Sequence, residues 1–134
     1  MKIKIILLLI LFVSCATPRN CPDLVHNSVN KITETADGEL YTGRCMTYEN
    51  DIKRSVQQYI NGKDYGKWVF YFPNGKVQTK GRFNKNGQRI GVWKYYHETT
   101  GELSQISRYS RSGERVGKWV RYNPEGVKID EVNY

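Results

Sequence analysis

From Gly38 onward the chain alternates between stretches rich in Trp, Tyr, Phe and Val and short polar turns that contain glycine. Pro73-Asn-Gly75 and Asn61-Gly62 are two such turns. Glycine and Asn-Gly tolerate the positive φ angles that tight hairpin turns need. Aromatic and β-branched stretches bounded by such turns are typical of β-hairpins. The pattern therefore predicts one all-β domain over residues 38–134, with strands joined as antiparallel hairpins.

The predicted hairpins share a recurring phrase. About every 25 residues, a glycine is followed two positions later by tryptophan or cysteine and five positions later by tyrosine. The four copies begin at Gly43-Arg-Cys45, Gly66-Lys-Trp68, Gly91-Val-Trp93 and Gly117-Lys-Trp119, with Tyr48, Tyr71, Tyr96 and Tyr122 as the tyrosines. Each second stretch of a unit ends in an aromatic residue: Tyr59, Phe83, Tyr109 and Tyr134. Such periodicity indicates units that stack on copies of themselves, so we expect an elongated antiparallel meander of about four hairpin repeats.

The N-terminal residues are of a different kind. Lys2 and Lys4 precede an apolar run over residues 5–13, which is too short for the roughly 20 residues of a membrane-spanning helix. This layout is typical of a secretory signal over residues 1–14. Leu11-Phe-Val-Ser14-Cys15 resembles the lipobox of bacterial lipoproteins, with phenylalanine where leucine is usual. The resemblance implies cleavage before Cys15, a diacylglycerol on its sulfur and membrane tethering. The alternative is an ordinary secretory signal with an incidental cysteine.

Residues 15–37 carry no sustained apolar period, and we expect a lipid-anchored tether followed by an N-terminal cap. Once Cys15 is lipidated, Cys21 and Cys45 remain as an even pair, which can close a disulfide in an oxidising compartment. Cys45 stands where later units have tryptophan, so a cross-link there would replace packing lost at the end of the array. The alternative is two buried free thiols.

The phrase Gly-x-Trp-x-x-Tyr-x-x-x-Gly, closed by an aromatic residue and Asn-Gly, resembles a MORN-repeat variant of bacterial proteins. The resemblance covers residues 38–134, and similar proteins are often labelled YwqK-type antitoxins. It implies a meander of hairpins that binds proteins or membranes and has no enzymatic activity. The first unit departs most from the pattern, with Cys45 for tryptophan and Asp51 for glycine, as an end-capping repeat can.

Strand alternation separates two sets of side chains. One set is aromatic and nearly free of charge, so we expect it to form the core together with Cys45: Trp68, Phe70, Trp93 and Trp119. The other pairs a base with a tyrosine in each unit and is the candidate binding face: Arg44, Tyr48, Lys67, Tyr71, Lys94, Tyr96, Lys118 and Tyr122. The structural alternative for this second set is a tyrosine ladder edged by solubilising lysines.

Charge favours an anionic partner. The chain has a net charge of +8, and the segment from Lys53 to Arg121 holds 15 bases against four acids. A basic surface attracts anionic partners and speeds their association. In an envelope these partners are acidic proteins, lipid head groups or glycans. Nucleic acid is not expected, because the chain has no nucleic-acid motif and the sequence predicts a secretory signal.

No catalytic constellation stands out. His26 and His97 have no companion Cys, Asp or Ser at an informative spacing, and His97 before a turn is an ordinary solvated histidine. Metal sites need several clustered His, Cys or carboxylate groups, and the sequence has none. We therefore expect no enzyme, no metal and no cofactor.

The sequence thus predicts an envelope lipoprotein, anchored in the outer membrane and facing the periplasm, that binds a protein partner through its repeat sheet. One alternative is an antitoxin or immunity protein that neutralises a toxin. The other is direct binding of the basic face to anionic lipid or glycan, which would depend strongly on salt because exposed charges are screened.

Overall fold

The structure is a computed structural model, and it describes residues 19–134. This part of the chain consists of β-strands and one short 3-10 helix, which confirms the predicted all-β class. The first elements are β1 (Arg19–Asn20), the 3-10 helix η1 (Cys21–Asp23), β2 (Leu24–Asn27), β3 (Ile32–Thr35), β4 (Gly43–Glu49), β5 (Ile52–Ile60) and β6 (Lys63–Asp64). The remaining strands are β7 (Gly66–Tyr71), β8 (Val77–Phe83), β9 (Arg89–Tyr96), β10 (Leu103–Tyr109), β11 (Lys118–Tyr122) and β12 (Lys128–Asn133).

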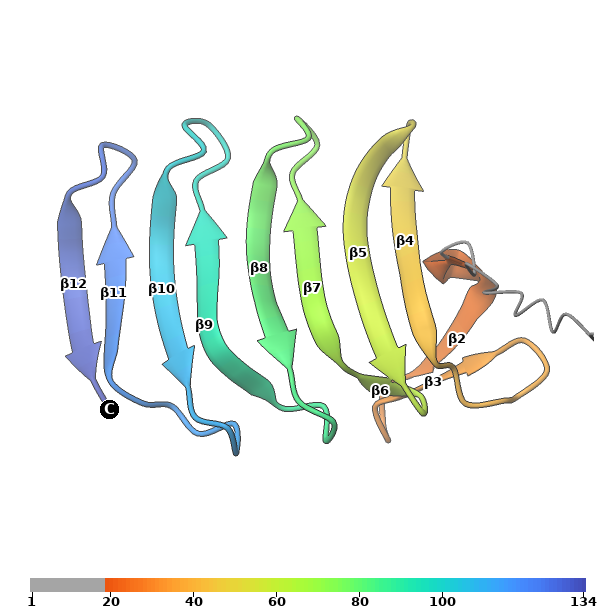
Figure 1. Cartoon of the computed structure of the whole chain (residues 1–134). Helices are drawn as coiled ribbons and strands as arrows, with labels where there is room; N and C mark the ends of the chain where they lie inside the picture. Colours follow the sequence, from red (N-terminus) through yellow and green to blue (C-terminus); the bar gives the residue numbers. More distant parts are fainter. Residues whose placement is uncertain (1–18) are drawn as a thin grey trace, which may run out of the picture.

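The repeat region forms a single antiparallel meander. Strands β4, β5 and β7 to β12 follow one another across the sheet in chain order, as Figure 1 shows. The short β6 pairs with β5, and β1 adds to the outer edge of β4 in parallel. Strands β2 and β3 form a separate hairpin at the same end of the molecule (Figure 1). The antiparallel meander predicted from the repeats is therefore confirmed.

Each hairpin carries a register shift beside its motif tyrosine. Tyr71 lies opposite Val77, whereas the preceding Phe70 lies opposite Thr79, so Gln78 is an extra residue on β8. Equivalent shifts occur beside the motif tyrosines of the other three hairpins. A β-bulge of this kind increases local twist and changes the face to which the preceding side chains point.

Aromatic rings pack edge to face along one side of the sheet, which we call the tryptophan face. The ring of Trp68 lies 5.4 Å from that of Tyr59 and 5.0 Å from that of Phe83, centroid to centroid. Phe83 is in turn 5.0 Å from Trp93. In the last unit Trp119 lies between two tyrosines in the same manner. Phe83 therefore lies between the tryptophans of two successive units, and each aromatic residue that ends a second strand packs against at least one tryptophan.

A hydrogen bond repeats with the rings. Each indole N–H donates to a backbone carbonyl on the second strand of the preceding hairpin, at 2.9 Å for Trp68, 3.2 Å for Trp93 and 3.0 Å for Trp119. Buried indoles need such a partner, so the bond fixes each ring over its neighbour strand.

The predicted core residues differ in burial. Trp68 and Trp93 are buried, with exposed fractions of 9% and 2%, whereas Phe70 and Trp119 are only partly buried. The opposite face also buries Val69 and Val120 in its middle row. Burial is therefore not confined to the tryptophan face, because a single layer has to pack neighbouring side chains against each other on both sides.

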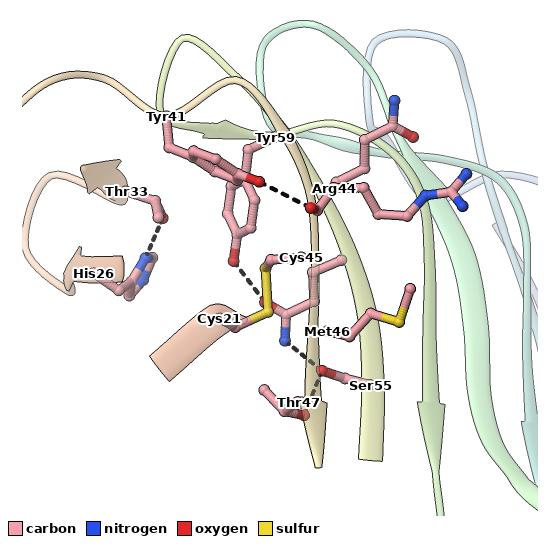
Figure 2. Close-up of a disulfide and its surroundings, with 12 residues drawn as sticks. Cys21, His26, Thr33, Tyr41, Arg44, Cys45, Met46, Thr47, Ser55 and Tyr59 are labelled. Carbon is pink, nitrogen blue, oxygen red and sulfur yellow. Dashed lines mark hydrogen bonds between the residues drawn. A yellow bond between two sulfur atoms is a disulfide. The ribbon is translucent and has the colours of Figure 1, made fainter. Parts of the chain in front are cut away.

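The N-terminal end is closed differently. Cys21 and Cys45 form a disulfide, and Cys45 is fully buried beneath it (Figure 2). The β2–β3 hairpin is joined to the sheet by backbone hydrogen bonds, including one of 2.7 Å from the N–H of Thr33 to the carbonyl of Gly62. The segment for which the sequence predicts a tether and a cap thus contains, from Arg19 on, a hairpin fixed to the first unit.

Candidate binding face

The eight residues predicted to form a binding face lie on the same side of the sheet, opposite the tryptophan face. Their side is fixed by one cross-strand row, in which each residue pairs with the next: Met46, Val56, Val69, Lys80, Lys94, Ile106 and Val120. Directly paired residues of an antiparallel sheet share a face, and so do residues two apart on one strand. We call this side the basic face.

The predicted bases and tyrosines differ in exposure. Arg44, Lys67, Lys94 and Lys118 are all exposed. Tyr48 at the N-terminal end is 53% exposed, whereas the three later motif tyrosines are half-buried. The tyrosines therefore contribute partly to packing between hairpins, and the bases provide most of the accessible chemistry.

Sequence reasoning missed the bases that the second strands add to this face. Arg82 lies directly opposite Lys67, and Lys80 lies directly opposite Lys94. Arg108 of β10 lies opposite Val92 on the same side. Alternation along β8 and β10 could have indicated these residues, but their opposition to other bases depends on register shifts that the sequence does not reveal.

The two like-charge pairs lie on three adjacent strands, β7, β8 and β9. Among residues 19–134, no acidic side chain forms an ion pair with Lys67, Lys80, Arg82 or Lys94. The ammonium of Lys80 lies 5.4 Å from the centre of the Tyr96 ring, which offers it a cation–π contact. Like charges directly opposite each other destabilise a sheet, so this arrangement costs folding free energy.

The ends of the basic face are closer to neutral. Lys118 forms a 2.9 Å ion pair with Glu131, which also bonds to Lys128 at 3.1 Å. These hydrogen bonds lower the pKa of Glu131. At the other end Arg54 pairs with Glu49. Unpaired positive charge is therefore concentrated in the middle of the face, and Lys118 is less available to a partner than the sequence alone indicated.

At the N-terminal end of the tryptophan face, polar side chains form hydrogen bonds around the disulfide (Figure 2). The hydroxyl of Tyr59 donates to Gln57 at 2.6 Å, and the amide of Gln57 donates to Ser55 at 3.1 Å. Burial, with the nearby charge of Asp64, raises the pKa of Tyr59 to about 12. Tyr59 is therefore a neutral hydrogen-bond donor at physiological pH.

The two histidines have structural contacts. His26 Nδ1 lies 2.8 Å from the hydroxyl of Thr33, across the β2–β3 hairpin (Figure 2). His97 is half-buried, and its Nε2 lies 2.9 Å from the carbonyl oxygen of Tyr122 in the next unit. The sequence predicted an ordinary solvated histidine at this position. In the structure His97 instead joins two hairpins and is only partly accessible to solvent.

Two further observations bear on the expectations about metal and membrane. Within residues 19–134, no group of three or more His, Cys, Asp and Glu residues is placed to hold a metal ion. The same residues include no helix that is long and apolar enough to cross a membrane. Cys15, the predicted lipidation site, lies outside the described residues.

Comparison with known proteins gives little. No family model matches the chain, and no curated protein matches it. A solved structure, the crystal structure of a GtfA/B complex bound to UDP and GlcNAc, is similar over 87% of this chain at 11% identity, with a TM-score of 0.37. The chain spans 26% of the length of that neighbour. A similarity of this size carries no argument about function.

Proposed function

We propose that this chain is a non-catalytic binding module of the bacterial envelope, tethered by a lipid on Cys15, that recruits an acidic protein through its basic face. In this proposal the repeat sheet is of the MORN-variant type, which its sequence motifs resemble. A single-layer sheet leaves a broad surface open to a partner, which suits recruitment.

One observation carries the proposal. Lys67 faces Arg82, and Lys80 faces Lys94, on three adjacent strands. Within residues 19–134 none of these four bases forms an ion pair with an acidic side chain. Folding gains nothing from two like-charge pairs, since each repels across a spacing of about 5 Å. A partner with acidic groups over these strands would relieve both repulsions at once and would also be steered by the net positive charge.

The test uses a charge reversal that separates folding from binding. The double substitution Lys67→Glu and Lys94→Glu turns both like-charge pairs into opposite-charge pairs. It should stabilise the sheet and remove the concentration of positive charge in the middle of the basic face. The control is Lys85→Glu with Arg111→Glu, two exposed positions in turns, which changes the net charge by the same amount.

We would crosslink the full-length protein in its own envelope, capture it and identify the attached molecules by mass spectrometry. The proposal predicts one enriched acidic protein that the control retains and the Lys67→Glu/Lys94→Glu variant loses. If that protein is a toxin, the antitoxin or immunity alternative holds. Salt-sensitive recovery of lipid or glycan alone would contradict recruitment of a protein.

A further inference from the structure

One position of the repeat changes character between units. It lies two residues before the glycine of each Gly-x-Trp phrase and directly opposite the aromatic residue that ends the preceding second strand. The three pairs are Asp64 with Tyr59, Arg89 with Phe83 and Arg115 with Tyr109. Structurally equivalent places therefore hold a carboxylate in one unit and a guanidinium in the next two.

The two arginines cover their tryptophans. The guanidinium of Arg89 lies 4.4 Å from the centre of the Trp93 ring, and that of Arg115 lies 5.0 Å from Trp119. Such stacking is a favourable cation–π contact and shields the ring from solvent. Asp64 has a short, negatively charged side chain and cannot supply the same cover to Trp68.

A pocket of about 790 Å³ lies at this place on the tryptophan face. Its aromatic lining comes from Tyr59, Trp68 and Phe83 of the sheet, and the β2–β3 hairpin forms another wall. Its size is within the roughly 300–1,000 Å³ of small-molecule sites, which combine aromatic surfaces with a few convergent polar groups.

The charged part of the lining is mostly basic. Lys31 from the hairpin contributes a positive charge, as do Lys63 and Arg89 from the sheet, and His26 adds an imidazole. Asp64 is the acidic member among the described lining residues. A cationic ligand would therefore meet repulsion from three permanent charges, whereas an anionic group would be attracted.

Asp64 is nevertheless short of partners. Of the buried side-chain nitrogen and oxygen atoms in residues 19–134, its Oδ1 is the one with no hydrogen bond. Burial raises the pKa of this carboxyl, although the charges of His26 and Lys31 act in the opposite direction. A buried acceptor without a donor is costly, so a ligand hydroxyl or amide N–H that reached this carboxylate from the pocket would lower that cost.

We propose that this pocket binds an acidic sugar, with ring hydroxyls donating to Asp64, the acidic substituent held by Lys31, Lys63 and Arg89, and the sugar ring against the aromatic lining. The negative face of an aromatic ring attracts the polarised C–H groups of a sugar. A simple anion would leave both Asp64 and the rings unused. The pocket opens on the tryptophan face, opposite the basic face, so this site is independent of the proposed recruitment of a protein.

The three indole N–H signals of the protein provide the readout. We would label the disulfide-bonded protein with ¹⁵N and titrate it with glucuronate, using glucose, inorganic phosphate and argininamide as matched probes. Glucuronate should shift the Trp68 signal saturably, while Trp119, which does not line this pocket, stays in place. Glucose should bind at least about tenfold more weakly, because it lacks the acidic group.

Two variants localise the effect. Asp64→Ala should weaken glucuronate binding by about tenfold or more, since the hydroxyl donors lose their acceptor. Asp64→Arg copies the residue found in the next two units and should abolish binding by covering Trp68. Glu125→Ala, which removes an exposed carboxylate from a distant turn, should bind as the wild type does.

Several results would overturn the proposal. An equal response to phosphate would mean a plain anion site, and a response to argininamide alone would mean a cation site. Unchanged binding by both Asp64 variants, or a Trp68 signal that does not move with glucuronate, would also refute it. None of these outcomes affects the capture experiment on the opposite face.

Discussion

The middle and the N-terminal end of the sheet solve the same packing problem by different chemistry. In the middle, Trp93 packs against Phe83, is covered by Arg89 and donates a hydrogen bond to a carbonyl of the preceding strand. At the N-terminal end, Cys45 occupies the tryptophan position and is cross-linked to Cys21. A repeat with a neighbour on each side can bury a large ring, whereas the terminal repeat has one neighbour and depends on a covalent link and an added hairpin.

The largest expected effect on stability comes from removing the buried tryptophan in the middle of the sheet. Trp93→Ala should destabilise the protein by about 3–5 kcal/mol, because the ring is almost fully buried and its removal leaves a cavity. Trp119→Ala should cost less, since that ring is partly exposed. Chemical denaturation of the oxidised protein measures both. Equal losses for the two variants would contradict the difference between interior and outer units.

The next effect comes from breaking the N-terminal closure. Replacing both Cys21 and Cys45 with Ser should lower the free energy of unfolding by about 2–4 kcal/mol, because the unfolded chain regains the freedom of a loop of 24 residues. Hydrogen exchange should accelerate most in the β2–β3 hairpin and β4. If exchange instead rose evenly across β7 to β12, the disulfide would not act as a closure of one end.

A glycine inside the middle region sharpens the same comparison. A Cβ atom at Gly81 would overlap the indole of Trp93, whose six-membered ring lies against the glycine. Gly81→Ala should therefore cost about 1–3 kcal/mol through overpacking, although alanine is otherwise acceptable in a strand. Thermal unfolding measures the effect of the clash, since Gly81 is not among the glycines with a positive φ and alanine adds no backbone strain there. A Gly81→Ala protein as stable as the wild type would mean that Trp93 can move aside.

A smaller effect distinguishes Asp64 from the arginines of later units. Burial raises its pKa, so the folded state binds a proton more tightly than the unfolded chain does, and Asp64 costs stability once it ionises. Asp64→Asn should stabilise the protein at pH 7 and lose that advantage as the pH falls below about 4, the unfolded value for aspartate. Melting curves at pH 3 and pH 7 test this. A larger advantage at pH 3 than at pH 7 would reverse the sign of the argument.

Much of the fold was accessible from the sequence because the repeat encodes it locally. The Gly-x-Trp phrase and the glycine turns predicted the strands β4, β5 and β7 to β12, and alternation predicted which side Trp68 and Lys67 occupy. The β2–β3 hairpin was not predicted, since it lies in a polar segment without an apolar period. Its position depends on long-range contacts, among them the bond between Thr33 and Gly62.

The candidate sites were predicted less completely. Alternation identified Lys67 and Lys94, but their opposition to Arg82 and Lys80 follows from bulges that shift the register between strands. The pocket beside Trp68 was missed because Asp64 reads as an ordinary turn residue until its place is aligned with Arg89. Cross-strand register, and not composition, creates both features.

The central claim is that the basic face holds like charges for a partner at the expense of stability. The most direct measurement is the free energy of unfolding of the Lys67→Glu/Lys94→Glu variant beside the wild type, at low and high salt. We predict a variant that is more stable by about 0.4–2 kcal/mol at low salt, from two pairs at 0.2–1 kcal/mol each, with a smaller difference at high salt. A variant less stable than the wild type would show that these lysines support the fold, and would contradict the account.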